Sequence, residues 1–236
     1  MPHSLFISDL HLSAAHARSM SAFETFITTQ AMRAEALYIL GDLFEYWAGD
    51  DDLNDPFHKR VTDALSSLSS TRVYLMCGNR DLLIGQELAG ACNAVLLEDP
   101  ALIDLYGTPT LLSHGDMLCT DDAEYQKFRK TVRSPDFKHE FLSRPLSERK
   151  AWIRQLRERS IEEKLGKDSA IMDVNEEAVS ALLREYRYAR LIHGHTHRPD
   201  RHVHMVDGHR CERWVLGDWD DGANALRADA DGITRI

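Results

Sequence analysis

The 236-residue sequence has few cysteines, and none of the four belongs to a Cys-x-x-Cys pair. This scarcity argues against a disulfide framework and against a thiolate metal site, so reduced thiols are the expected state. The four are Cys77, Cys92, Cys119 and Cys211. We interpret Cys119, which lies near a candidate site, as a buried bystander.

Long apolar runs are also missing, since no segment approaches the roughly 18 residues that a membrane-spanning helix needs. The first residues contain neither a basic region nor a long apolar stretch, so we predict no signal peptide. Positive charge is in deficit, and the net charge of −10 argues against generic nucleic-acid binding. Nothing in the composition indicates an obligate protein partner. At this length we expect one large domain, or a domain with an insertion.

The first half of the chain alternates between apolar strands and amphipathic helices. Strands are predicted at residues 4–8, 37–40 and 72–77. Between them we predict one helix over about residues 17–33 and another that begins at Pro56. This order is typical of parallel pairing in an α/β fold.

The second half begins with a hairpin around residues 107–109 and continues as helix from 121 to about 188. The pattern Asp173-x-x-Glu176 predicts a capping box at the start of the last helix. Strands follow at 191–194, 202–206 and 210–216. We therefore predict an α/β protein with a central β-sandwich flanked by helices. Its core comprises residues 1–120 and 189–236, and residues 121–188 form a helical cap inserted in that core.

Polar side chains with metal-binding chemistry follow five of these strands. Gly41 ends the second strand, so Asp42 lies where open α/β sheets place their ligands. The complete set of candidate ligands is Asp9, His11, Asp42, Asn79, His114, His195 and His197. Two carboxylates, one amide oxygen and four imidazoles suffice for two divalent ions that share Asp42. Such mixed ligation without thiolate favours Mn²⁺, Fe²⁺ or Zn²⁺ over Mg²⁺ or Ca²⁺.

Each cluster taken singly has an ordinary explanation. Asp-x-His occurs often by chance, and Asn79 beside Gly78 is typical of a left-handed turn. The alternation His193-Gly-His195-x-His197 could be a metal-scavenging surface loop, and we interpret His193 as a support for its neighbours. Five clusters in this order, each at a strand end, favour a dinuclear metal centre.

The motifs Asp9-x-His11, Gly41-Asp42, Gly78-Asn79, His114 and Gly194-His195-x-His197 resemble those of the calcineurin-like metallophosphoesterases. The resemblance implies that Asp9, His11, Asp42 and His197 hold one metal ion. It implies that Asp42, Asn79, His114 and His195 hold the other. Most members have a histidine after the Gly-Asn, often assigned as general acid, whereas this chain has Arg80.

Gly-Asp-Leu-Phe-Glu-Tyr-Trp at 41–47 and Gly-Asn-Arg-Asp at 78–81 look like one branch of that family. Its members hydrolyse the pyrophosphate of UDP-2,3-diacylglucosamine in lipid A biosynthesis. The resemblance implies two Mn²⁺ ions, catalytic roles for Asp42 and Arg80, and a peripheral position on the cytoplasmic face of the bacterial inner membrane. The implied substrate contacts are Asn79, Arg80, Asp122, Ser160, Lys164, Lys167 and His195.

The predicted insertion is basic, with 13 lysines and arginines against 6 acidic residues over 127–167. Aromatic and aliphatic residues are interleaved with this charge. A basic, apolar helical cap suits an anionic head group, acyl chains and an anionic membrane surface. A solvated helix pair that packs its apolar stripe on the core explains the pattern equally well.

Arg80 has two interpretations as well. Its guanidinium is suited to neutralising pyrophosphate charge, because it can bind two oxygens at once. Alternatively it forms a structural ion pair with Asp81 or with the acidic loop at 50–52. For the whole chain, another dinuclear nucleotide phosphodiesterase and a non-catalytic scaffold of the same fold remain as alternatives, although a scaffold would have no use for the complete ligand set.

Overall fold

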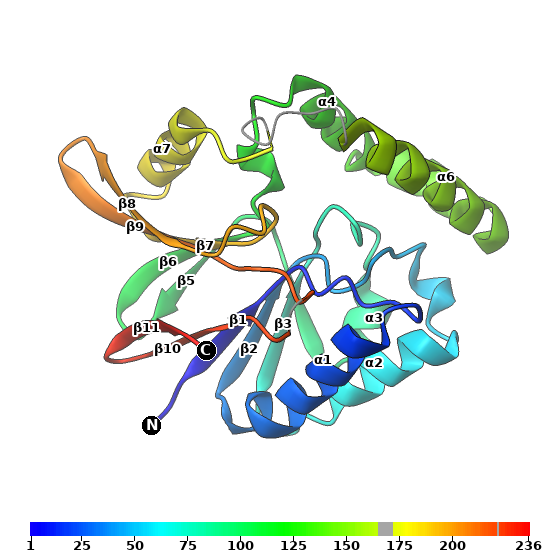
Figure 1. Cartoon of the computed structure of the whole chain (residues 1–236), viewed down its shortest axis with the longest axis horizontal. Helices are drawn as coiled ribbons and strands as arrows, with labels where there is room; N and C mark the ends of the chain where they lie inside the picture. Colours follow the sequence, from blue (N-terminus) through cyan, green and yellow to red (C-terminus); the bar gives the residue numbers. More distant parts are fainter. Residues whose placement is uncertain (165–171, 221) are drawn as a thin grey trace.

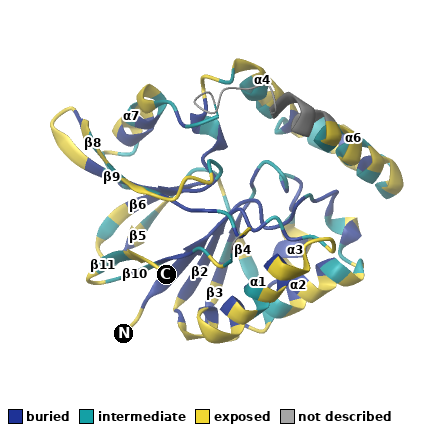
Figure 2. Ribbon diagram, viewed as in Figure 1, coloured by how far each residue is buried: buried dark blue, intermediate teal, exposed yellow. Residues whose placement is uncertain are grey.

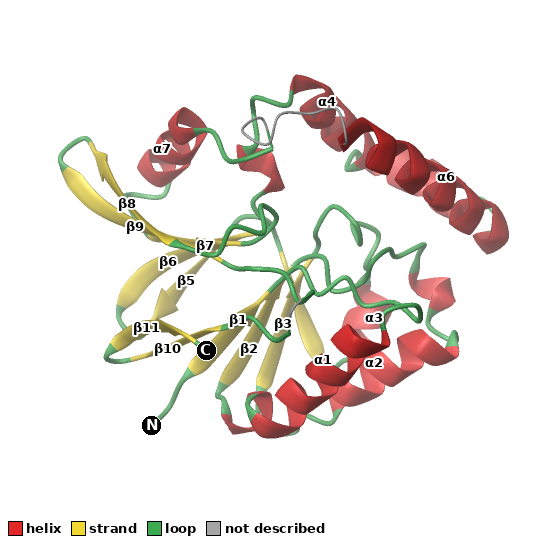
Figure 3. Ribbon diagram, in the orientation of Figure 1, coloured by secondary structure: helices red, strands yellow, loops and turns green. Residues whose placement is uncertain are grey.

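The computed structural model describes residues 1–164, 172–220 and 222–236, with the backbone alone at 159–164. Two β-sheets lie face to face, and helices cover their outer faces (Figures 1 and 3). The predicted α/β sandwich is therefore confirmed. The first sheet has the strand order β11-β10-β1-β2-β3-β4, and the second has the order β5-β6-β7-β9-β8.

The first sheet is parallel from β1 to β4, and β10 and β11 extend it in antiparallel fashion. Its strands are β1 (Ser4–Ile7), β2 (Ala36–Leu40), β3 (Arg72–Met76), β4 (Ala94–Leu97), β10 (Leu226–Asp229) and β11 (Gly232–Arg235). Every residue of β1 and β2 is buried, as Figure 2 shows, because both faces of these strands are covered.

Side chains alternate between the two faces of this sheet. Leu5 and Ile7 pack with the helices, in the same apolar cluster as Phe23 and Val61. The helices on this face are α1 (Ala17–Thr29), α2 (Pro56–Ser66) and α3 (Gln86–Ala91). The helix predicted over 17–33 ends earlier, at Thr29, and a short 3₁₀ helix continues it over Ala31–Arg33. Pro56 occupies the first turn of α2, as predicted.

The opposite face of the first sheet meets the second sheet in a separate apolar layer. Phe6, Tyr38 and Leu40 pack there with Leu112 and Ile192 of the second sheet. The ring of Tyr38 stacks between Phe6 and Tyr74 across three adjacent strands, with centroid distances of 4.8 and 4.6 Å. These cross-strand contacts lock the register of β1, β2 and β3.

The second sheet mixes parallel and antiparallel pairs. Its strands are β5 (Ala101–Leu105), β6 (Thr108–Ser113), β7 (Arg190–His193), β8 (Arg201–Val206) and β9 (His209–Val215). The hairpin predicted around residues 107–109 is confirmed, and a second hairpin turns at Asp207-Gly208 between the predicted strands at 202–206 and 210–216. β6 and β7 are parallel neighbours, so their carboxyl ends point to the same edge of the sheet.

The segment predicted as helical contains four helices in its described part: α4 (Ala123–Val132), α5 (Pro135–Leu142), α6 (Leu146–Lys164) and α7 (Glu176–Glu185). α7 packs Val179 and Leu183 on Leu111 and Leu191, on the outer face of the second sheet. In Figure 1, α6 instead extends away from that sheet, towards the loops that follow the first sheet. The capping box predicted from Asp173 is wrong. Asn175 is the N-cap of α7, and its side chain accepts from the N–H groups of residues 177 and 178.

Candidate metal centre

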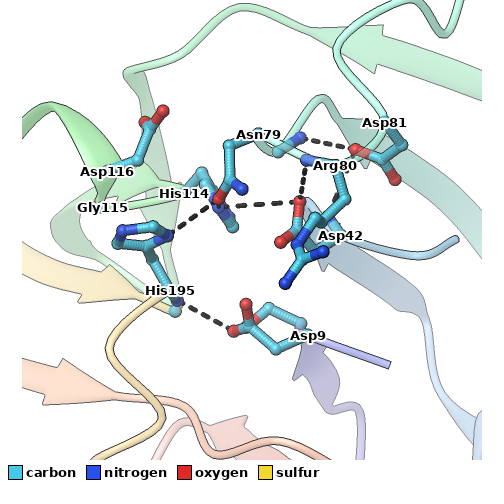
Figure 4. A network of polar contacts seen from close by, with 12 residues as sticks. Asp9, Asp42, Asn79, Arg80, Asp81, His114, Gly115, Asp116 and His195 are labelled. Carbon is cyan, nitrogen blue, oxygen red and sulfur yellow. Dashed lines mark hydrogen bonds and ion pairs between the residues drawn. The ribbon is translucent and has the colours of Figure 1, made fainter. Parts of the chain in front are cut away.

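The seven predicted ligands come together at one edge of the sandwich. Each follows the carboxyl end of a strand, and the parallel order of β1, β2 and β3 and of β6 and β7 aligns those ends. Figure 4 shows five of them, Asp9, Asp42, Asn79, His114 and His195, around a common space. His11 and His197 complete the group beside Asp9.

The backbone turns sharply at these positions. Asp9, His11, Asp42, His195 and His197 all have positive φ, between 47° and 69°. Residues other than glycine adopt this region at a cost of about 1 kcal/mol or more, and such strain concentrates at functional sites. Gly41 has φ 91°, and a Cβ there would lie 2.6 Å from the Cα of Gly78. The turn after β2 therefore requires glycine, which allows the loops after β2 and β3 to approach closely.

Asp9, His11 and His197 form the first group of donors, with ligand atoms all within 4.8 Å of one another. His197 Nε2 lies 3.3 Å from Asp9 Oδ1 and also 3.3 Å from His11 Nε2. Among the described residues, Asp9 Oδ1 has no hydrogen-bond partner although it is buried. A buried carboxylate oxygen without a donor, facing two imidazole nitrogens, fits a bound cation.

Asn79, His114 and His195 form the second group. Asn79 Oδ1 lies 3.0 Å from His114 Nε2 and 2.9 Å from His195 Nδ1. Asp42 lies between the two groups, because its Oδ1 is 3.8 Å from His114 Nε2 and its Oδ2 is 4.0 Å from His11 Nδ1. A carboxylate in this position is placed to serve both groups at once.

Burial dominates the electrostatics of the site. It lowers the pKa of both His11 and His195 to about 3, so these imidazoles are neutral at pH 7, the form that binds metal. Burial also raises the pKa of Asp42 to about 7, and the negative charges of Asp81 and Asp9 add to the shift.

His114 behaves differently from its neighbours. Burial would lower its pKa, but attraction by Asp42 and Asp9 outweighs that effect and raises the pKa to about 9. The carboxylates thus draw positive charge into the centre, as a cation site requires. The Nδ1 atom of His114 lies 2.9 Å from the carbonyl oxygen of Leu40, which directs Nε2 towards Asn79 and Asp42.

Asp81 organises the ligand loops through the backbone. Its carboxylate accepts hydrogen bonds from the N–H groups of Gly78 at 2.7 Å, Leu43 at 2.8 Å and Asp42 at 3.2 Å. Asp42 Oδ1 in turn accepts from the N–H of Arg80 at 2.8 Å (Figure 4). From the sequence, Asp81 is predicted only as a possible partner for Arg80, although its position in the Gly-Asn-Arg-Asp motif is a signal for this role.

Two further acceptors support the histidines of the last motif. His197 Nδ1 lies 2.9 Å from Asp218 Oδ2, a residue that the sequence did not single out. His193 is fully buried, with Nδ1 2.9 Å from the carbonyl oxygen of Gly194 and Nε2 3.2 Å from Arg213. These contacts agree with its interpretation as a support for the loop.

Arg80 reaches a partner that neither alternative named. Its Nη1 lies 3.3 Å from Glu45 Oε1, whereas the carboxylate of Asp81 is occupied by backbone donors. The alternative interpretation of Arg80 as part of a structural ion pair therefore named the wrong partner, because the pair forms with Glu45 and not with Asp81 or the 50–52 loop. One quarter of the Arg80 side chain is exposed, so it lies at the rim of the centre.

The remaining predicted substrate contacts come after β6 in the chain. Asp122 is the N-cap of α4 and accepts from the N–H of Tyr125 at 3.1 Å. Ser160 and Lys164 belong to α6, but their side chains lie outside the described part of the chain, and so does the whole of Lys167. Their predicted contacts with substrate stay predictions.

Asp116, which sequence analysis missed, connects α4 to the centre. It is fully buried and accepts from Tyr125 Oη at 2.9 Å, Arg129 Nε at 2.9 Å and Arg133 Nη2 at 3.2 Å. Burial would raise its pKa, but the positive charges of His114, Arg133 and Arg129 hold that pKa well below the usual range. The ring of Tyr125 stacks on His195, with centroids 5.9 Å apart. No sequence spacing marks these partners.

A further cluster of possible metal ligands, Asp52, Asp55 and His58, lies outside this centre. The ammonium group of Lys150 on α6 lies 2.6 Å from Asp52 Oδ1 and 4.0 Å from Asp55 Oδ2. A cation of the chain itself therefore neutralises this cluster.

Comparison with known proteins agrees with the geometry. The family model for the calcineurin-like phosphoesterases matches residues 3–199. The chain belongs to this family. A dimetal phosphatase from Danio rerio aligns with this phosphoesterase at a TM-score of 0.53 and 13% identity, covering 95% of this chain and 92% of that one, which shows the shared fold.

Curated relatives match this phosphoesterase over nearly its whole length. A protein of Aromatoleum aromaticum is 53% identical over 97% of this chain and 94% of its own. A protein of Marinobacter nauticus is 48% identical over 95% of this chain and 93% of its own. A protein of Edwardsiella ictaluri is 46% identical over 99% of this chain and 91% of its own. All three are named UDP-2,3-diacylglucosamine hydrolase.

Proposed function

We propose that this phosphoesterase hydrolyses the pyrophosphate bond of UDP-2,3-diacylglucosamine, giving UMP and 2,3-diacylglucosamine 1-phosphate. One observation carries the proposal: identity of 46–53% to hydrolases of that name extends over 95–99% of the chain. A match confined to the sandwich would support only a generic phosphoesterase. The full-length match includes the helices after β6, where a lipid-linked substrate needs contacts beyond its phosphates.

The donor set supports a dinuclear centre. Asp9, His11, Asp42 and His197 would hold one divalent ion, and Asp42, Asn79, His114 and His195 the other. Two such ions, which we propose to be Mn²⁺, would supply an activated water, a polarised phosphoryl oxygen and charge stabilisation in the transition state. The mixture of imidazole, carboxylate and amide oxygen, without thiolate, favours Mn²⁺, Fe²⁺ or Zn²⁺ over Mg²⁺ or Ca²⁺, and the choice of Mn²⁺ among them rests on the family resemblance.

Arg80 suits a phosphate leaving group. A sugar 1-phosphate has a second pKa of about 6, so it departs near neutral pH without receiving a proton. A general acid in the position of Arg80 is then unnecessary, and a permanent positive charge is more useful. From the rim of the centre, the guanidinium can pair with two oxygens of the pyrophosphate. Asn79 and His195 would orient the pyrophosphate from inside the centre.

The basic helices favour a lipid substrate at a membrane surface. Among the described residues, no helix has the length and apolarity to cross a bilayer. Phe128 of α4 and Leu142 of α5 are 37% and 42% exposed, amid the lysines and arginines of 127–167. We propose that this surface meets acyl chains and anionic lipid at the cytoplasmic face of the inner membrane, with Ser160, Lys164, Lys167 and Asp122 near the head group.

Hydrolysis in ¹⁸O-labelled water tests the proposed chemistry. Attack at the uridylyl phosphorus predicts that the label appears in UMP and that the acylated sugar phosphate stays unlabelled. Phosphoanhydrides should also react far faster than alkyl diesters of UMP, because an alkoxide leaves poorly without a general acid. Label in the sugar phosphate would contradict attack at the uridylyl phosphorus. Equal rates on alkyl diesters would contradict the assignment of Arg80.

A further inference from the structure

Glu45 lies in the loop after β2, three residues beyond Asp42, and only 8% of it is exposed. Backbone hydrogen bonds fix the position of Glu45. The N–H of Glu45 donates to the carbonyl oxygen of Leu12 at 3.0 Å, and the N–H of Leu12 donates to the carbonyl oxygen of Leu43 at 2.9 Å. The loop that carries Glu45 is thus hydrogen-bonded through its backbone to the loop that carries His11.

Three positively charged or ionisable groups converge on this one carboxylate. Oε2 lies 3.4 Å from His11 Nδ1, and Oε1 lies 3.3 Å from Arg80 Nη1. Oε1 also forms a close ion pair with Nη2 of Arg157, which comes from α6, 112 residues further along the chain. The Arg157 guanidinium also lies over the ring of Tyr46, 6.0 Å from its centroid.

Each contact has a different consequence. Among the described residues, the buried Nδ1 of His11 has no hydrogen-bond partner, but the negative charge of Glu45 lies 3.4 Å away and favours a proton on this atom. Nε2, which faces His197, is then left as the electron-pair donor. The contact with Arg80 restrains a flexible side chain at the rim. The contact with Arg157 joins α6 to the loop that carries Asp42, and loss of the carboxylate would leave two guanidinium groups without this counter-charge.

We infer that Glu45 is a positioning residue that couples the helical cap to the metal centre, holding Arg157 and Arg80 through one oxygen and orienting His11 through the other. This inference rests on the proposed function, since it concerns the same centre and the same substrate. It assigns to one side chain two effects that are separable by experiment: metal affinity through His11, and lipid-substrate binding through Arg157.

Metal binding to stripped protein tests the first effect without any catalysis. Glu45→Gln keeps the shape of the side chain and an oxygen acceptor but removes the charge. Calorimetric titration with Mn²⁺ should show one of two ions bound about 10–100-fold more weakly. The matched control is Glu185→Gln, an exposed glutamate in the last turn of α7, which should bind both ions as wild type does. Unchanged affinity for both ions in Glu45→Gln would overturn the role of Glu45 at His11.

A mutant cycle tests the second effect. Arg157→Gln should leave Mn²⁺ affinity within about twofold and raise KM for UDP-2,3-diacylglucosamine about tenfold, with kcat little changed. In Glu45→Gln, Arg157 has already lost its negatively charged partner, so adding Arg157→Gln should raise KM hardly further. Fold-changes that multiply would refute the coupling. If Glu45→Gln folds poorly, Arg157→Gln still tests the role of Arg157 by itself, because an unchanged KM in that variant would refute it.

The proposed function and this inference fail in different ways. Absence of hydrolysis by the wild-type protein with Mn²⁺ would reject the function itself. Normal wild-type hydrolysis, together with Glu45→Gln that binds metal and lipid substrate normally, would reject only the positioning role.

Discussion

Asp116→Asn is the most informative perturbation of the contact between α4 and the sandwich. The substitution keeps the size of the side chain and one acceptor oxygen, but it removes the charge that faces Arg129 and Arg133. The carboxylate is fully buried, and each arginine side chain is about one-fifth exposed. Tyr125 Oη donates to the same oxygen as both arginines, so all three partners feel the change.

The expected loss can be bracketed from these contacts. Breaking a fully buried ion pair costs about 3–5 kcal/mol. Here the asparagine oxygen still accepts a hydrogen bond, and partial exposure lets water solvate the guanidinium groups. Asp99 also offers a second carboxylate to Arg129, at 3.9 Å. We therefore expect a loss of about 2–3 kcal/mol in the free energy of unfolding. For a chain of this length that corresponds to about 5–10 °C in Tm.

Chemical unfolding and thermal melting of Asp116→Asn measure this loss, with Asp231→Asn as the control. Asp231 is an exposed aspartate in the turn between β10 and β11, so its substitution should change stability by no more than about 0.5 kcal/mol. Activity on the lipid substrate should fall in Asp116→Asn, because Tyr125 stacks on His195. Equal stability of the two variants would refute the reasoning that Asp116 anchors α4.

Three further predictions address the centre, the cap and the second sheet. Asp42→Asn should reduce bound Mn²⁺ below two ions per chain and lower activity by orders of magnitude, while the melting curve stays cooperative. Full activity with fewer than two bound ions would contradict the two-metal proposal. The value of kcat/KM for the diacylated substrate should fall in Ser160→Ala, Lys164→Ala and Lys167→Ala, whereas hydrolysis of a small chromogenic phosphoester should be unaffected. Equal losses on both substrates would indicate a purely structural role for these residues. Burial would raise the pKa of Glu212, but hydrogen bonds from Arg201, Arg210 and Trp214 lower it from about 4.5 to about 2. The charged form therefore stabilises the fold above pH 4.5, so Glu212→Gln should lower the free energy of unfolding by about 1 kcal/mol at pH 7. The denaturation midpoints of the variant and the wild type should converge as the pH falls towards 2. A difference between the midpoints that stays constant with pH would contradict this.

The ligand residues could be predicted because their signal is local. Asp9, Asp42 and Asn79 each follow a short apolar run, and parallel strands bring their carboxyl ends to one edge whatever the rest of the chain does. The strand and hairpin pattern is local in the same sense, since Asp207-Gly208 by itself favours the tight turn between β8 and β9.

The residues that position those ligands could not be predicted, because their partners are distant in sequence. Glu45 meets Arg157 across 112 positions, and Asp116 gathers its donors from a helix whose docking no spacing rule describes. The capping box failed for a related reason. Asp173 and Asn175 both suit an N-cap, and a tertiary hydrogen bond from the N–H of Asn175 to the carbonyl oxygen of Leu118 accompanies the later start of α7.

Release of UMP from UDP-2,3-diacylglucosamine, by protein first stripped of metal and then supplied with Mn²⁺, tests the central claim most directly. The account predicts no release by the stripped protein and rapid release after about two equivalents of Mn²⁺ per chain, with Asp42→Asn inactive throughout. Release that does not depend on metal, or no release with any divalent ion while an unrelated nucleotide is cleaved rapidly, would contradict it.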